Sequence, residues 1–232
     1  MQCVILAGGL AERLLPLTYD IPKSMILAAG KPFLEYQIKL LECNGIKDII
    51  LCIGYLGEKI EEYFGDGLRF GVNIRYSREQ KLLGTGGALK EASDLLDAYF
   101  FVLYGDSYCN IEYMNMCNVG LLIRLNMIAE AVMAVYKNKN KFDKSNVKFT
   151  DKHRILYDKN GGKEYEYIDY GISYLSKKVL DLVPSGHFYD LANVFKTLST
   201  TYRLIGFEVF NRFYEIGSFE GLKEFESYIG DK

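Results

Sequence analysis

The opening of the chain constrains the fold most strongly, because a short apolar run ends there at two glycines. Residues 3–7 read CVILA, which has the length and composition of a buried β-strand. Gly8 and Gly9 then begin a loop of about a dozen residues before apolar sequence resumes. Since glycine has no Cβ, backbone N–H groups in this loop can approach a ligand closely beyond the end of the strand.

The same loop carries two cations at a fixed spacing. Pro16 and Pro22 fix φ along the path between Arg13 and Lys23. Arg13 offers a planar fork of donors and Lys23 a point charge, a combination that suits the oxygens of a polyphosphate. A glycine pair or a lone cation is more often part of a solvated turn, whereas the whole arrangement favours an anion site.

The rest of the first half alternates between helical and strand patterns. The predicted order is a helix at 32–44, a strand at 48–53, a helix at 57–64, a strand at 72–76, a helix at 83–96 and a strand at 99–104. This order is typical of a parallel sheet with right-handed crossovers. Ligands of such sheets bind beyond the carboxyl ends of the strands.

The second half reads as a further set of strands and helices. The prediction is a helix at 111–126, a strand at 129–136, a hairpin of 146–149 and 154–158, a strand at 165–175, helices at 177–183 and 189–199, a strand at 203–210 and a helix capped by Ser218. At 232 residues and 49% hydrophobic composition, the chain fits one large domain. The predicted fold class is α/β, a single Rossmann-like three-layer α/β/α domain with a mostly parallel mixed sheet.

The charge and the cysteine content indicate which kinds of binding partner and which cellular compartment to expect. Lys and Arg number 28 against 30 Asp and Glu, and the cations are scattered, so we expect no nucleic-acid partner. The five cysteines form no C-x-x-C pair, which is typical of reduced thiols. No apolar run reaches the ~20 residues of a membrane span, and no signal-peptide pattern opens the chain. The prediction is a cytoplasmic protein with a small-molecule ligand.

Two later motifs fall where the strand order predicts a ligand. The segment LGTGGAL opens the helix at 83–96, and its glycines could present unpaired N–H groups at a positive helix terminus to a base or a phosphate. The strand at 99–104 ends in Gly105 and Asp106, and a carboxylate there is suited to a divalent cation, which prefers oxygen ligands. Each motif alone is more often a simple turn.

The opening stretch resembles the signature of the nucleotidyltransferases that make nucleoside-diphosphate sugars, L-A-G-G-x-G-T-R-L-x-P-L-T-x-x-x-P-K-x-M. The matching residues are Leu6, Ala7, Gly8, Gly9, Arg13, Leu14, Pro16, Leu17, Thr18, Pro22, Lys23 and Met25. Ala11 and Glu12 stand where the family usually has Gly and Thr. A Gly-Glu-Arg version of the loop occurs in relatives that handle muramic acid phosphates.

Shorter matches follow in the family's order. The resemblance implies a nucleobase pocket at Gly84, Thr85, Gly86 and Gly87, with Glu79 before it, and metal ligation by Asp106. It implies a second metal carboxylate at Glu215, where the family usually has Asp. It places the acceptor substrate at Asp158, Lys159, Asp169 and Gly171, with Asp169 standing where relatives commonly have Asn.

The activity that the resemblance implies is attack by a sugar 1-phosphate on the α-phosphorus of a nucleoside triphosphate, with Mg²⁺ held by Asp106 and Glu215. Arg13 would bind the leaving pyrophosphate, Lys23 the α-phosphate and Lys159 the acceptor phosphate. Leu6, Ala7, Gly8, Gly9 and the glycine segment would hold the nucleoside. Residues 1–110 would then form a nucleotide-binding half and residues 111–232 an acceptor-binding half.

Several alternatives remain open at this point. The two glycine segments look most like those of heptose and mannose 1-phosphate guanylyltransferases, which favours GTP. Uridylyl or cytidylyl transfer to a sugar or non-sugar phosphate is the nearest alternative, and a non-catalytic nucleotide-sugar sensor is a rival from another class. A dinucleotide-dependent oxidoreductase is disfavoured because G-x-G-x-x-G does not follow the first strand. We expect a monomer or a homodimer.

Overall fold

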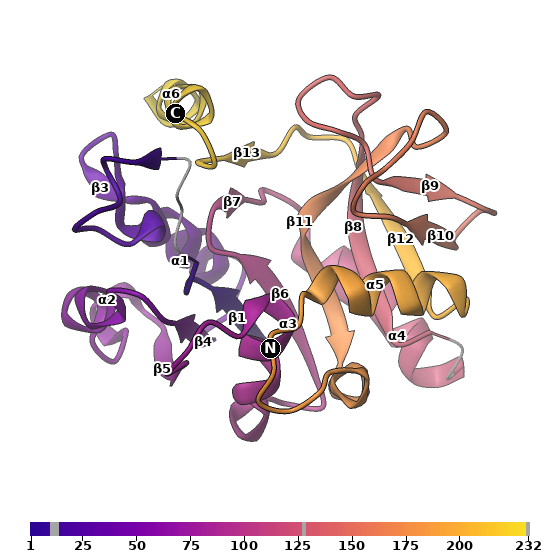
Figure 1. Cartoon of the computed structure of the whole chain (residues 1–232), viewed down its shortest axis with the longest axis horizontal. Helices are drawn as coiled ribbons and strands as arrows, with labels where there is room; N and C mark the ends of the chain where they lie inside the picture. The colour runs from indigo at the N-terminus through magenta and orange to yellow at the C-terminus, as the bar shows by residue number, and fades with distance from the viewer. Residues whose placement is uncertain (10–13, 127–128, 231–232) are drawn as a thin grey trace.

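A computed structural model describes residues 1–9, 14–126 and 129–230 of the chain. Within these residues, a single mixed sheet of nine strands forms the centre of the molecule, and helices cover both of its faces (Figure 1). The principal strand order is β10-β9-β11-β6-β1-β4-β5, and β8 pairs with both β11 and β12. The predicted α/β class with a mostly parallel mixed sheet is therefore confirmed.

The first half of the chain builds the parallel part of the sheet. The strands are β1 (Gln2–Leu6), β4 (Asp48–Ile53), β5 (Asn73–Arg78) and β6 (Tyr99–Tyr104), and the helices that connect them are α1 (Phe33–Cys43), α2 (Gly57–Phe64) and α3 (Gly84–Glu91). β1 lies between β4 and β6, and β5 pairs with β4, all in parallel. The carboxyl ends of β1, β4 and β6 consequently meet at one edge of the sheet.

The second half adds antiparallel pairing. Its strands are β8 (Ala131–Lys137), β9 (Val147–Phe149), β10 (Ile155–Tyr157), β11 (Tyr167–Ser176) and β12 (Leu204–Val209), and its helices are α4 (Tyr113–Asn126), α5 (Leu191–Thr200) and α6 (Phe219–Gly230). β11 pairs antiparallel with β6 and so joins the two halves into one sheet. No helix in the described ranges combines the length and apolar character that a bilayer span needs.

The buried side chains form a hydrophobic cluster on each face of the sheet. Along β1, Cys3 and Ile5 enter one cluster and Val4 enters the other, as expected for alternating side chains of a central strand. A third cluster packs α6 against α1, with the rings of Phe33 and Phe225 4.8 Å apart and edge to face. This third cluster fixes the end of the chain beside the opening loop.

The structure corrects two helix predictions and adds short elements that the sequence did not reveal. The helix predicted at 83–96 ends at Glu91, and residues Ser93–Leu95 form a separate 3₁₀ turn, because Ser93 and Asp94 favour turns over helix interiors. The helix predicted at 177–183 is a 3₁₀ helix, Lys177–Leu182. Two-residue ribbons join β2 (Leu27–Ala28) to β3 (Lys31–Pro32), and β7 (Ser107–Tyr108) to β13 (Tyr214–Glu215).

Candidate active site

A cleft of about 460 Å³, the central cleft, opens where β1, β4 and β6 end. Its walls bring together nine of the residues that were predicted to bind the nucleotide or the metal or to act in catalysis. They are Leu6, Ala7, Gly8, Gly9, Lys23, Glu79, Gly84, Thr85 and Asp106. Its other lining residues are Leu14, Ser24, Cys52, Leu82, Ala88, Tyr104, Gly105 and Gly217. The predicted catalytic residue Arg13, with its neighbours Ala11 and Glu12, lies outside the described residues.

Glycines at the floor of the central cleft allow neighbouring turns to pack closely. A Cβ added to Gly105 would lie 2.7 Å from the carbonyl oxygen of Leu6, which accepts the Gly105 N–H at 3.0 Å. A Cβ on Gly8 would lie 2.8 Å from Oε1 of Glu79, whereas one on Gly9 would meet no atom of the described residues within 4 Å. Gly8 and Gly105 are therefore needed for packing between turns.

Lys23 and Asp106 form an ion pair inside the central cleft. The Nζ of Lys23 lies 2.5 Å from Oδ2 of Asp106, and Ser107 donates its hydroxyl to Oδ1 at 3.2 Å. Lys23 begins a short 3₁₀ turn that follows Pro22, whose carbonyl accepts the N–H of Met25 at 2.8 Å. The opening loop and the end of β6 thus place a cation and a carboxylate side by side.

A buried glutamine on α1 holds the turn that carries Asp106. Gln37 donates its amide hydrogens to the carbonyl oxygens of Tyr104 and Ser107, at 2.8 Å each. Its own Oε1 is buried and has no hydrogen-bond partner among the described residues. An unpaired buried oxygen costs about 1–3 kcal/mol, so Gln37 is better explained by the turn it fixes than by stability. Sequence reasoning missed Gln37, although a polar residue between Leu34 and Leu41 on an apolar helix face was a usable signal.

Glu215 reaches the same turn from the far end of the chain. Ribbon pairing sets Glu215 opposite Ser107, and the Ile216 N–H donates to the carbonyl oxygen of Asp106 at 3.0 Å. A Cβ on Gly217, a residue of the cleft wall, would lie 3.1 Å from Oε2 of Glu215. The structure therefore sets Glu215 beside the Asp106 turn and close to Gly217 of the cleft wall, while Glu215 itself is not among the described residues that line the central cleft.

The donor chemistry of this pair fits a hard divalent cation. Asp106 and Glu215 offer carboxylate oxygens, which are the protein ligands that Mg²⁺ prefers. Within the part of the chain that the structure describes, no group of three or more His, Cys, Asp or Glu side chains is arranged to hold a metal. A Mg²⁺ ion held by these two carboxylates would take its other ligands from substrate oxygens and water, as is usual for this ion.

Glu79 carries a second carboxylate into the central cleft. Its Oε2 accepts the N–H of Leu83 at 3.0 Å, and its Oε1 lies against Gly8 and Gly54. Burial raises the pKa of the Glu79 carboxyl, and the Leu83 N–H partly opposes this shift. The side chain thus connects the end of β5 to the entry of α3, which supports the predicted role of Glu79 in holding that loop.

The glycine segment at the start of α3 is only partly exposed to the central cleft. Gly84 and Thr85 line it, whereas Gly86 and Gly87 donate their N–H groups to the carbonyl oxygen of Tyr189, at 2.9 and 3.0 Å. The expectation that these N–H groups are unpaired is therefore wrong. The segment before α5 packs over them, and this contact is too distant in sequence for local reasoning to find.

Asp169 and Gly171 form an irregularity in β11 beside the Asp106 turn. The Gly171 N–H donates to Oδ1 of Asp169 at 3.0 Å, and pairing with β8 shifts register after Asp169. Gly171 has φ +95°, and a Cβ on it would lie 2.8 Å from the side chain of Ser107, so a larger residue is excluded. Burial raises the pKa of Asp169 to about 6, against the opposing effect of the Gly171 N–H.

Tyr104 connects this irregularity to the central cleft and was missed by sequence reasoning. It is the last residue of β6 and lines the cleft. Burial raises its pKa well above the usual value, and the charges of Asp169, Asp190 and Asp106 raise it further. The phenol therefore stays protonated and can donate a hydrogen bond. The aromatic run 99–104 gave no local signal that set Tyr104 apart.

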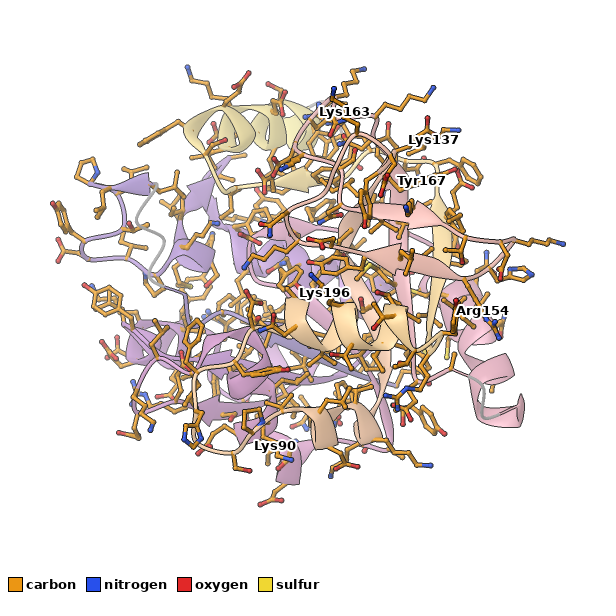
Figure 2. All side chains as sticks on the ribbon, turned by 45° about the vertical axis from the view of Figure 1, so that its right-hand side comes forward. Lys90, Lys137, Arg154, Lys163, Tyr167 and Lys196 are labelled. Atoms are coloured by element: carbon orange, nitrogen blue, oxygen red, sulfur yellow. The ribbon has the colours of Figure 1, made fainter. Side chains whose placement is uncertain are left out.

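Asp158 and Lys159 are both paired with residues of α5 or its cap. Lys159 forms an ion pair with Asp190, and Asp158 accepts from Lys196 at 3.0 Å. Figure 2 shows Lys196 on the side of α5 that faces β10. Neither Asp158 nor Lys159 is among the described residues that line the central cleft. The structure therefore puts these two predicted acceptor residues at its periphery.

Comparisons with known proteins agree with this geometry. The family model for nucleotidyl transferases matches residues 2–185. A D-glycero-α-D-manno-heptose 1-phosphate guanylyltransferase of Campylobacter jejuni is 34% identical over 183 residues, or 78% of each protein. A UTP–glucose-1-phosphate uridylyltransferase of Synechocystis is 34% identical over 207 residues, covering 82% of this chain and 53% of its own length.

A solved structure extends the likeness to the whole chain. HddC from Yersinia pseudotuberculosis, in a crystal structure complexed with GMP-PN, superposes with a TM-score of 0.79. The two chains are 27% identical, and the match covers 98% of this chain and 99% of that one. The described sheet and the central cleft therefore lie within the region that the two proteins share.

Proposed function

Because this chain belongs to the nucleotidyl transferase family, we propose that it transfers a nucleotidyl group from a nucleoside triphosphate, with GTP favoured, to a sugar 1-phosphate. The observation that carries the proposal is the ion pair of Lys23 and Asp106 in the central cleft, at a turn that the Tyr214–Glu215 strand joins from the far end of the sequence. The two relatives named above, one a guanylyltransferase and one a uridylyltransferase, both act on sugar 1-phosphates.

The proposed reaction needs no nucleophile from the protein. A phosphate oxygen of the sugar 1-phosphate forms a bond to the α-phosphorus, the bond between that phosphorus and the bridging oxygen breaks, and pyrophosphate leaves. Catalysis then depends on orientation and on charge stabilisation. We assign Lys23 to the α-phosphate, Arg13 to the departing pyrophosphate and Lys159 to the acceptor phosphate.

Asp106 and Glu215 are the residues we assign to Mg²⁺. When bound there, the ion would neutralise charge on the phosphate oxygens. Ser107 and Lys23 keep the Asp106 carboxylate in one orientation, and ribbon pairing with β7 holds Glu215 beside it. The Glu215 side chain is one methylene longer than the Asp that the family usually has at this position. The position of the ribbon backbone therefore has to accommodate the longer side chain if its carboxylate is to reach the same ion.

The preference for GTP is supported by the chemistry of Glu79. Guanine presents two neighbouring donors on its Watson–Crick edge, N1–H and N2–H₂, and a carboxylate can accept from both. Uracil presents one N–H between two carbonyl oxygens, which a carboxylate would repel. Glu79 lines the central cleft, and its Oε1 lies against Gly8 without a hydrogen bond from any of the described residues, so the carboxylate is suited to reading a guanine.

The acceptor side is suited to a polyol. Asp169 can accept hydrogen bonds from hydroxyl groups, and Tyr104 can donate one. The predicted acceptor residues Asp169 and Gly171 belong to residues 111–232. The lining residues of the central cleft all belong to residues 1–110, apart from Gly217. This division supports the proposal of a nucleotide-binding half and an acceptor-binding half.

Because both proposed substrates are small soluble molecules, we propose that the protein acts in the cytoplasm and has no nucleic-acid partner.

Pyrophosphate release tests the proposal directly. Purified enzyme is supplied with Mg²⁺, with one of GTP, UTP, CTP or dTTP, and with one of a panel that includes heptose, mannose and glucose 1-phosphates. We expect release only when both substrates are present, and the fastest release with GTP. Nucleotide binding without pyrophosphate release from any pair would contradict the proposal and favour a sensor. Faster release with UTP would replace guanylyl by uridylyl transfer.

A further inference from the structure

We propose that Asp190 is a positioning residue that connects the nucleotide turn at the start of α3 to Lys159. The inference rests on the proposed function and deepens it, because it says how the acceptor side of the site is organised. Asp190 is the N-cap of α5, and α5 lies between α3 and β10 (Figure 1). A residue at this place contacts both Thr85 of the cleft wall and Lys159.

The carboxylate of Asp190 has partners from three parts of the fold. Thr85, which lines the central cleft, donates its hydroxyl to Oδ1 at 2.8 Å. The N–H of Ala192 donates to the same oxygen at 3.2 Å, which is the capping bond of α5. Lys159 forms its ion pair with the other oxygen, Oδ2. One half-buried side chain thus joins the cleft wall, a helix terminus and the predicted acceptor cation.

The backbone around Asp190 makes this connection rigid. Leu191 donates its N–H to the hydroxyl oxygen of Thr85 at 2.8 Å, and Tyr189 donates its N–H to the carbonyl oxygen of Leu83 at 2.8 Å. The N–H groups of Gly86 and Gly87 return to the carbonyl oxygen of Tyr189. The α3 entry and the α5 cap therefore move as one body, and Asp190 is attached to it by backbone and side chain.

Capping alone does not explain why this residue is an aspartate. Asn and Ser cap helices as well as Asp does, and either could also accept from Thr85. The negative charge also favours the positive end of α5, and its ion-pair partner is Lys159. The Lys159 side chain is 66% exposed, and exposed ion pairs add little to stability. Beyond its contribution to the helix cap, the charge of Asp190 therefore serves to orient Lys159.

Orienting Lys159 in advance should strengthen binding of the acceptor. A lysine on an exposed turn samples many rotamers, and a ligand that orders it loses affinity in doing so. Asp190 holds Lys159 beside the wall of the central cleft before the acceptor arrives. We therefore expect the KM of the sugar 1-phosphate to depend on Asp190, whereas kcat and the KM of the nucleotide should depend on it much less.

The variant Asp190→Asn tests this, because it keeps the cap and the contact with Thr85 but removes the charge. We expect the KM of the sugar 1-phosphate to rise about 3- to 10-fold, with kcat and the nucleotide KM within about twofold. Asp66→Asn is the matched control, since Asp66 also accepts a backbone N–H, from Leu68 at 3.0 Å, in an exposed turn of another element. It should leave all three constants unchanged.

A double-mutant cycle shows whether Asp190 acts through Lys159. In a Lys159→Met background, Asp190→Asn should have no further effect on the KM of the sugar 1-phosphate. An equal effect in both backgrounds, an unchanged KM in Asp190→Asn, or a lower KM would each overturn the inference. If Asp190→Asn does not fold, Asp190→Ser keeps a capping hydroxyl and takes its place. Absence of pyrophosphate release in the unmodified enzyme would instead count against the proposed function.

Discussion

The two lysines that we assign to the nucleotide side and to the acceptor side are held in different ways. On the nucleotide side, the side chains of Lys23 and Asp106 are 16% and 29% exposed and lie 2.5 Å apart. On the acceptor side, the side chain of Lys159 is 66% exposed in its pair with Asp190. Since water weakens exposed ion pairs, the nucleotide side is fixed more firmly before substrate arrives. Changes on that side should therefore lower kcat, and changes on the acceptor side should raise the acceptor KM.

The largest expected effect comes from removing the cation on the nucleotide side. Lys23→Ala should lower kcat by about 10²–10³, since a lost charge-stabilising donor costs roughly 2.7–4 kcal/mol of barrier. Steady-state pyrophosphate release measures this, and thermal unfolding checks the fold. Lys39→Ala, which removes an exposed lysine paired with Glu42 on α1, is the control and should leave kcat unchanged. Near-full turnover of Lys23→Ala would show that kcat does not depend on the cation of the nucleotide side.

The next effect concerns the support of the Asp106 turn. Gln37→Glu keeps the shape of the side chain but replaces a donor by an acceptor facing the carbonyl oxygens of Tyr104 and Ser107. Residues that orient metal ligands typically cost 10–100-fold in metal affinity when they are changed, so we expect about tenfold more Mg²⁺ to be needed for half-maximal rate. A Mg²⁺ titration of the rate measures this. An unchanged Mg²⁺ requirement in a folded variant would show that the turn does not depend on Gln37.

A third change sharpens the comparison at the base. Glu79→Gln replaces two acceptors by one acceptor and one donor, which suits the edge of uracil better than that of guanine. A bidentate contact of this kind discriminates by about 1–3 kcal/mol. We therefore expect the ratio of kcat/KM for GTP to that for UTP to fall about 10- to 100-fold, while the acceptor KM stays constant. A ratio that does not change would place base selection elsewhere.

The smallest expected effect belongs to Asp169 on the acceptor side, and it depends on pH. The folded-state pKa of Asp169 is raised to about 6 from an ordinary value of 3.8. Because the pKa of Asp169 is higher in the folded state, folding favours the protonated side chain. This contribution to stability is fully present below pH 3.8 and is lost as the pH rises to about 6. Above that, a buried charge remains, so Asp169→Asn should be more stable at pH 8 by about 1–3 kcal/mol.

Denaturant unfolding at pH 8 and pH 4.5 measures the difference for Asp169→Asn, which should shrink at the lower pH. The same titration should raise the acceptor KM of the unmodified enzyme below about pH 6, because a protonated Asp169 accepts hydrogen bonds from hydroxyls less well. An acceptor KM that is independent of pH between 5 and 8 would separate Asp169 from acceptor binding, whatever the stability result. These two pH values lie roughly one unit below and two units above the raised pKa of Asp169.

The same contrast explains what could be predicted from sequence. The predicted bounds 48–53, 57–64 and 99–104 match β4, α2 and β6, because apolar periodicity and terminal glycines are local signals. Glu79 and Asp106 follow strand ends, Lys23 and Thr85 lie at the starts of a 3₁₀ turn and of α3, and the structure brings all four to one cleft. Motif order was therefore sufficient to identify residues that line one cleft, and their assignment to the nucleotide stays a prediction.

The residues that sequence reasoning missed are held by contacts between distant segments. Ribbon pairing of β7 with β13 and the contact of Tyr189 with Gly86 join parts of the chain that show no shared local pattern. Gln37, Tyr104 and Asp190 act through such contacts as well, so their roles became visible only in three dimensions. Gln37 alone left a trace, as a polar residue on an apolar helix face.

The central claim is that Asp106 and Glu215 hold one divalent ion together with the triphosphate. Electron paramagnetic resonance of Mn²⁺ tests this most directly, by titrating the ion into enzyme saturated with a non-hydrolysable GTP analogue. The account predicts one tightly bound Mn²⁺ in the unmodified protein and an affinity at least about tenfold weaker in Asp106→Asn and in Glu215→Gln. Unchanged Mn²⁺ affinity in either folded variant would contradict it.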